Sequence, residues 1–234
     1  MTKSLLTPNQ NKFFKFFQRC EPLHKNFYFS GGTALSEFYL RHRFSEDLDF
    51  FSEQEFEVTS LSQFLQTNKE KFEAKQIRYI QSFNRNLFFA AYADGSQLKL
   101  EFTYYPFPRL KKGKKIGNLQ IDSVLDIAVN KAFTLTQQVR GRDFFDIFAL
   151  AQKYNYEFAD LLKKARQKFD YPINYLQLGK NLLKVTEFLD DPILVKEIDK
   201  KLVEEYFLRL VKDLNLLTPS SYGGGGSQGQ AGLL

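Results

Sequence analysis

A pair of glycines followed closely by two alternating aspartates constrains this chain more than any other feature. The segment Phe29-Ser30-Gly31-Gly32 predicts a strand that runs into a sharp turn, and Asp47-Leu48-Asp49-Phe50 predicts the next strand. Residues i and i+2 of a strand point to the same face, so both aspartates face one way while Leu48 and Phe50 enter the core. Two neighbouring carboxylates repel each other unless a cation lies between them, and Mg²⁺ binds through one or two carboxylates together with substrate phosphates. The strand therefore predicts a metal site.

The glycines predict the phosphate-binding half of the same site. Gly31 and Gly32 have no Cβ, so the backbone can turn sharply and approach a ligand closely. A helix that starts at about Thr33 would present free backbone N–H groups to a phosphate, and Ser30 and Thr33 could add hydroxyl donors. A glycine pair alone is usually a turn, and an Asp-x-Asp alone is usually surface. Together, in this order and at this distance, they favour nucleotidyl transfer.

The same residues carry a family resemblance. Gly31-Gly32-Thr33-Ala34-Leu35, followed by Arg43-x-Ser45-x-Asp47-x-Asp49, resembles the AbiEii/AbiGii toxin family of nucleotidyltransferases, within the polymerase-β-like superfamily. A second block fits this family: a helical lysine, Lys131, and then Arg140-x-Arg142-Asp143-x-x-Asp146 on the next helix. The resemblance implies an α+β fold, in which a polymerase-β-like mixed sheet with flanking helices is followed by a C-terminal helical bundle.

A third carboxylate is expected on the strand predicted over residues 97–104. Leu98, Leu100 and Phe102 alternate with polar residues, which places Glu101 on the polar face. Superfamily members carry a third carboxylate on such a strand, as a metal ligand or a general base. The alternative is an exposed glutamate paired with Lys99 or another cation.

The resemblance implies roles for individual residues. The catalytic candidates are Asp47, Asp49, Glu101, Lys131 and Asp143, of which Asp47, Asp49 and Glu101 would bind one or two Mg²⁺ ions. The nucleotide-binding candidates are Ser30, Gly31, Gly32, Thr33, Arg43, Ser45, Lys131 and Arg142. Asp146 is expected to support the structure. The alternative for Lys131 is a lysine that extends along the surface. The alternative for Arg142, Asp143 and Asp146 is an ion pair within one helix.

A basic segment follows the strand that holds Glu101. Its candidates for RNA binding are Arg109, Lys111, Lys112, Lys114 and Lys115, with aromatic residues just upstream. Basic side chains near aromatic rings suit a single-stranded or tRNA-like ligand through phosphate contacts and stacking. A solvated loop is an equally good reading of the same residues.

Composition excludes several other classes of protein. The chain has 234 residues, 43% of them hydrophobic, and a net charge of +6, which favours nucleic acid only weakly. Cys20 is the single cysteine, and His24 and His42 are the only histidines, so disulfides and Cys/His metal clusters are not expected. No signal peptide or membrane-spanning segment is predicted, so we expect a cytoplasmic protein.

The predicted elements suggest three parts. A catalytic core over residues 1–120 contains strands at 27–29, 47–51, 77–83, 87–92 and 97–104, with a hairpin tip at 84–86, and helices at 8–20, 33–42 and 59–72. A helical domain over 121–218 contributes Lys131 and Asp143, with helices at 122–138, 142–153, 156–169, 172–189 and 192–215. The Gly/Ser-rich segment 219–234 is expected to be flexible and resembles an engineered linker.

The leading functional hypothesis is a Mg²⁺-dependent toxin of a toxin–antitoxin or abortive-infection system. It would transfer a nucleotide from a nucleoside triphosphate (NTP) to RNA, with the 3′ end of tRNA as the expected acceptor and a cognate antitoxin as a possible partner. One alternative is nucleotidylation of a protein partner. The other is a catalytically degenerate binding module.

Overall fold

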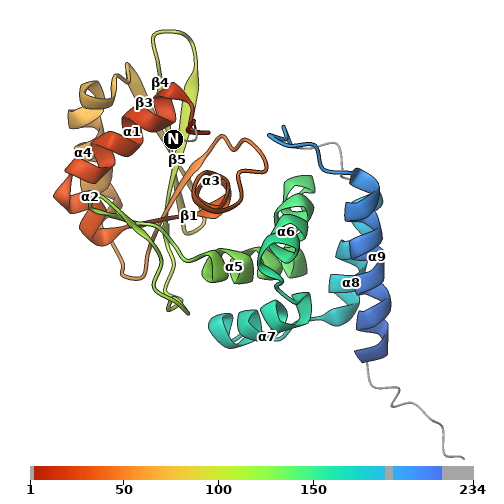
Figure 1. The fold of residues 1–234 in the computed structure, drawn as a ribbon. Coiled ribbons are helices and arrows are strands. Elements are labelled where there is room, and N and C mark those ends of the chain that lie inside the picture. The colour runs from red at the N-terminus through yellow and green to blue at the C-terminus, as the bar shows by residue number, and fades with distance from the viewer. Residues whose placement is uncertain (1–2, 188–191, 218–234) are drawn as a thin grey trace, which may run out of the picture.

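The computed structural model describes residues 3–187 and 192–217. A five-stranded mixed sheet forms one lobe together with helices of the N-terminal half (Figure 1). The strand order is β1-β2-β5-β4-β3. The strands are β1 (Tyr28–Ser30), β2 (Leu48–Ser52), β3 (Gln76–Ser82), β4 (Arg85–Ala91) and β5 (Gln97–Tyr104). Only the β2–β5 pair is parallel, and the other pairs are antiparallel. The α+β class expected from the sequence is confirmed.

Strand alternation divides the sheet into an apolar face and a polar face. Leu48, Phe50, Leu100 and Phe102 are fully buried. Helix α1 (Pro8–Arg19) covers this face, with the Phe17 ring stacked on Phe50 at 4.2 Å between centroids. Asp49 and Glu101 have the opposite parity, so they project from the other face.

Short helices connect the first strands. They are α2 (Glu21–Asn26), α3 (Gly31–Leu35), a π-helical turn (Ser36–Leu40), α4 (Val58–Asn68) and a 3₁₀ turn (Lys69–Phe72). The helix after the glycines thus begins at Gly31, two residues before the predicted Thr33. The π-helical turn that continues it ends where Arg41 adopts a left-handed conformation with φ of 57°.

The β3–β4 hairpin differs from the prediction at its tip. We predicted a tip at 84–86, but Arg85 already belongs to β4 and pairs with Thr103 of β5. The turn consists of Phe83 and Asn84, with Phe83 at φ of 55°. The tighter turn places the Arg85 side chain on the sheet instead of in a loop.

After residue 121 every described element is helical. A small ribbon of β6 (Lys115–Ile116) and β7 (Leu119–Gln120) leads into α5 (Val124–Gln137), α6 (Gly141–Tyr154), α7 (Phe158–Phe169), α8 (Tyr175–Leu183), a 3₁₀ turn (Lys184–Thr186) and α9 (Lys200–Leu217). These helices stack beside the sheet lobe, with α5 next to it (Figure 1). The last two predicted helices, 172–189 and 192–215, are shorter or start later than expected.

Two further expectations concern the ends of the chain and the membrane. The segment 219–234 lies outside the described residues. Within residues 3–187 and 192–217, every helix is too short or too polar to cross a bilayer.

Candidate active site

A cleft of about 420 Å³ lies between the polar face of the sheet and helices α5 and α6. Most of the residues predicted to form the site line it. These are Ser30, Gly31, Gly32, Arg43, Ser45, Asp47, Asp49, Glu101, Lys131 and Arg142. The elements that supply them are far apart in sequence, so the cleft exists only because the sheet and the helical lobe pack together.

The glycine turn is shaped by the side chains packed against it. Gly31 has φ of +75°, a conformation that favours glycine, and a Cβ there would lie 2.0 Å from Oδ2 of Asp49. A Cβ on Gly32 would lie 2.4 Å from Nη2 of Arg43 and 3.2 Å from Oγ of Ser45. The two glycines thus allow the backbone to contact the acidic strand and the buried arginine directly.

Strand register brings the central acidic residues side by side. Asp49 of β2 is the partner of Ser30 on β1 and of Glu101 on β5. Neighbouring strands lie about 4.8 Å apart, so these three side chains form one row across the sheet. Asp47 precedes β2 with the same parity as Asp49, and it also lines the cleft.

Two cations lie against the outer carboxylates. Lys99 is ion-paired with Asp47, and Arg85 grips Glu101, with Nε of Arg85 2.6 Å from Oε1 of Glu101. The alternative reading paired Glu101 with Lys99 or another cation, and in the structure that cation is Arg85, while Lys99 pairs with Asp47. Within the described residues, no three His, Cys, Asp or Glu side chains form a cluster arranged to hold a metal ion.

Asp49 is the acidic group left without a close cation among the described residues. Burial raises its pKa to about 6, and the charges of Glu101 and Asp47 add to the rise, while Lys99 and Lys131 oppose it. A carboxylate that is half-buried, negatively charged at neutral pH and next to two others is in an unfavourable state. Hard oxygen donors of this kind suit Mg²⁺. The residues therefore fit a divalent cation, which would replace Lys99 as the partner of Asp47 and Arg85 as the partner of Glu101.

On the opposite wall, Lys131 of α5 is held between two buried carboxylates. Its Nζ lies 2.7 Å from Oδ1 of Asp143 and 2.7 Å from Oδ2 of Asp146, both on α6. Asp146 also accepts from Nε of Arg43 at 2.7 Å and from Nη2 at 2.9 Å, and it contacts His42. Burial would raise the pKa of each aspartate, but the neighbouring cations prevail and lower both, that of Asp146 well below its usual value.

Two predicted site residues do not line the cleft. Thr33 is buried, and its hydroxyl donates to the backbone carbonyl of Asp47, so it stabilises the aspartate strand and has no free donor for a phosphate. Asp143 is also buried and contacts Lys131 and Arg140. Its observed contacts are those of a group that positions these two cations.

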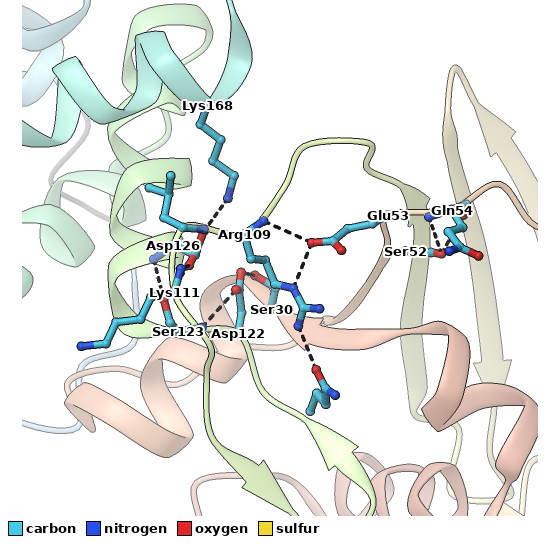
Figure 2. Close-up of polar contacts among 12 residues, drawn as sticks. Ser30, Ser52, Glu53, Gln54, Arg109, Lys111, Asp122, Ser123, Asp126 and Lys168 are labelled. Atoms are coloured by element: carbon cyan, nitrogen blue, oxygen red, sulfur yellow. Dashed lines mark hydrogen bonds and ion pairs between the residues drawn. The ribbon is translucent and has the colours of Figure 1, made fainter.

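A buried polar network supports the cleft from behind Ser30 (Figure 2). The Ser30 hydroxyl donates to Oδ2 of Asp122 at 2.7 Å. Asp126 accepts from the Ser123 hydroxyl, from the Lys168 ammonium of α7 at 2.8 Å, and from two backbone N–H groups of the basic segment. Burial raises the pKa of Asp122 to about 7, opposed mainly by the Ser30 hydrogen bond. The network joins β1, the basic segment, α5 and α7.

The basic segment lies outside the cleft lining. Arg109 contacts Glu53 (Figure 2) and Gln120. It also stacks over the Tyr28 ring at 4.4 Å, so its charge is already engaged. Lys114 donates to the backbone carbonyl of Phe38. The side chains of Lys111, Lys112, Lys114 and Lys115 are exposed.

Sequence reasoning missed several polar residues of the cleft, among them Arg85, Lys99 and Asn130, and a row of aromatic rings. Arg85 was assigned to a hairpin tip, and Lys99 was treated as a partner of Glu101, although its parity with Glu101 could have placed it in the site. Asn130 precedes Lys131 and gave no signal. Five aromatic residues also line the cleft: Phe51, Tyr105, Phe107, Phe133 and Phe169.

The family comparison shows that this chain is a nucleotidyltransferase. The family described as "Nucleotidyl transferase AbiEii toxin, Type IV TA system" matches residues 15–220, and this chain belongs to it. An uncharacterised protein of Aquifex aeolicus, strain VF5, is 31% identical over 190 residues, covering 80% of this chain and 87% of the relative. JHP933 from Helicobacter pylori has a similar fold, with a TM-score of 0.54 at 20% identity, over 92% of this chain and 99% of that one.

Proposed function

We propose that this nucleotidyltransferase transfers a nucleotide from an NTP to RNA in a Mg²⁺-dependent reaction, with the 3′ end of tRNA as acceptor. The observation that carries the proposal is the charge arrangement of the cleft. A row of carboxylates on β2 and β5 faces basic side chains on α5 and α6, and a glycine turn closes one end. A triphosphate with its bound cations matches this arrangement, since its phosphates suit the basic wall and its cations suit the acidic wall.

The acidic wall is the proposed metal site. Asp47, Asp49 and Glu101 would hold one or two Mg²⁺ ions. When bound, Mg²⁺ would neutralise charge on the triphosphate and lower the pKa of the acceptor hydroxyl. Asp49 supports this assignment because it carries a half-buried carboxylate with a raised pKa and no ion-pair partner among the described residues.

The basic wall is the proposed triphosphate site. Lys131 is fixed by two carboxylates of α6, so it can meet a phosphate without losing much side-chain entropy. Arg142 and Arg140 line the same wall, and the backbone at Gly31 and Gly32 offers the close approach that a phosphate needs. Asp143, Asp146 and Thr33 act here as positioning residues.

The acceptor and the biological role extend the proposal further. The exposed lysines of the basic segment support RNA as acceptor, because phosphate contacts dominate nucleic-acid affinity. The toxin family supports growth inhibition and an antitoxin as partner. We also propose that residues 1–120 and 121–218 are two domains, a catalytic core and a helical domain, which form the two sides of the cleft.

Labelled transfer tests the proposal. The protein is incubated with each α-labelled NTP, Mg²⁺ and bulk tRNA, and the products are resolved as RNA and protein. We expect label in RNA, loss of label with Asp49→Ala, and unchanged label with Asp213→Ala, which removes an exposed carboxylate of α9. Label in a protein band would instead support nucleotidylation of a partner. A second readout is the growth of cells that express the protein. If no label transfers, and cells that express Asp49→Ala grow no better than cells that express the wild type, the proposal fails.

A further inference from the structure

The carboxamide of Asn130 is unusual among the groups of the cleft. Asn130 lines the cleft, yet both its Nδ2 and its Oδ1 are buried and have no hydrogen-bond partner within the described part of the chain. A buried donor or acceptor left unpaired is costly, and a carboxamide has one of each kind. The proposed metal and phosphate contacts make no use of it.

The position of Asn130 on α5 places it between the basic wall and the aromatic residues. With 3.6 residues per turn, the direction of Asn130 around the helix axis lies between those of Lys131 and Phe133. Ile127 and Thr134, one turn away on either side, also line the cleft. Asn130 therefore lies on the helix face that borders the cleft.

The aromatic residues form a connected wall. Phe51 stacks on Tyr105 at 4.7 Å, and Tyr105 contacts Phe107 at 5.0 Å. Phe107 packs edge-on against Phe169 at 4.8 Å, and Phe133 stacks on Phe169 at 4.1 Å. These rings join β2, the segment after β5, α5 and α7 into one surface that borders a charged cleft. A flat, partly apolar ligand group fits such a surface by stacking.

We propose that this part of the cleft is the nucleobase site, in which the base of the NTP packs against the aromatic wall and Asn130 pairs with its hydrogen-bonding edge. The inference rests on the proposed function, because the NTP must first place its phosphates on the basic wall. Each of the four RNA bases presents a donor next to an acceptor on its pairing edge. A carboxamide, which presents one acceptor and one donor, can satisfy both groups at once.

Nucleotide binding with Mg²⁺ present tests the inference. ATP, CTP, GTP and UTP are titrated alongside inorganic tripolyphosphate, which has the phosphates and no base. For Asn130→Leu, a variant of similar size, we expect binding of the preferred NTP to weaken on the order of 10-fold, as for the loss of one bidentate pair. Tripolyphosphate binding should stay unchanged.

The stability of the protein without nucleotide provides a second readout. Asn130→Leu should not lower the melting temperature, because no protein contact is lost. The matched control is Asn181→Leu: the Asn181 amide is buried but donates to the backbone carbonyl of Leu135 at 2.9 Å, so its loss should lower the melting temperature. An equal drop for Asn130→Leu would show that the amide serves the fold, and would overturn the inference.

The outcomes separate this inference from the proposed function. Wild-type protein that binds NTPs while Asn130→Leu binds them equally well overturns the nucleobase site alone. Wild-type protein that binds neither NTPs nor tripolyphosphate overturns the proposed function and the nucleobase site with it. Asn130→Asp is the second variant, since a carboxylate accepts hydrogen bonds only: we expect it to change the ranking of the four NTPs, and an unchanged ranking and affinity contradicts the inference.

Discussion

Replacing Asp49 with asparagine should make the protein more stable at neutral and alkaline pH. The pKa of Asp49 is raised to about 6, from an ordinary value of 3.8. The difference between 3.8 and about 6 corresponds to about 3 kcal/mol at 1.36 kcal/mol per pKa unit. Because the folded state binds this proton more tightly, the wild type loses this stability as the pH rises from about 4 through about 6. The asparagine side chain of the variant has no charge to bury, so the variant avoids the loss.

Urea unfolding at a series of pH values, with a chelator present, measures the effect. Asp49→Asn and wild type should have similar free energies of unfolding at pH 4, and the variant should be more stable by about 3 kcal/mol at pH 8. Contributions from groups that do not interact with Asp49, such as Asp122, are common to both proteins and cancel in the difference. Asp213→Asn, which changes an exposed carboxylate of α9, is the matched control and should show no such trend.

The same experiment with Mg²⁺ strengthens the test. A cation bound to the acidic wall should stabilise the wild type at pH 8 and narrow its gap to the variant, since a ligand stabilises the state that binds it. With the chelator and no Mg²⁺, a variant that is no more stable than wild type at pH 8 would refute the claim that Asp49 carries an uncompensated charge.

Two further predictions concern the glycine turn and the basic wall. Gly31→Ala should lower the free energy of unfolding by clearly more than Gly95→Ala, which costs about 1 kcal/mol. Both glycines have positive φ, but of these two only Gly31 meets a side chain, that of Asp49. Chemical denaturation of the two variants gives the comparison. Lys131→Met should lower the free energy of unfolding by about 3 kcal/mol, because two buried carboxylates lose a partner. It should also abolish tripolyphosphate binding, because the proposed phosphate contact is lost. Calorimetry measures both effects, and intact binding would contradict the role of Lys131.

The sequence predicted those parts of the fold and the cleft that depend on local pattern. The alternation in 97–104 places Glu101 correctly because a strand side chain has only two possible faces. The acidic strand was found from the same alternation. The glycine turn was found because glycine is required where the backbone packs directly against Asp49.

The parts that were missed depend on contacts between distant segments. The ion pairs of Asp47 and Glu101 follow from the β2–β5 and β4–β5 registers, which no local pattern states. Arg85 was misplaced because a two-residue turn with Phe83 at positive φ lacks the usual Asn-Gly signal. Asn130 could not be found at all, because an unpaired amide is defined only by what surrounds it.

Binding of Mn²⁺, followed by electron paramagnetic resonance in the presence of ATP, tests most directly whether the acidic wall is one cation site. We expect the wild type to take up Mn²⁺, and Asp49→Asn and Glu101→Gln each to weaken this uptake strongly, while Asp213→Asn leaves it unchanged. Uptake that is the same in all four proteins would show that the carboxylates of β2 and β5 do not bind the metal together.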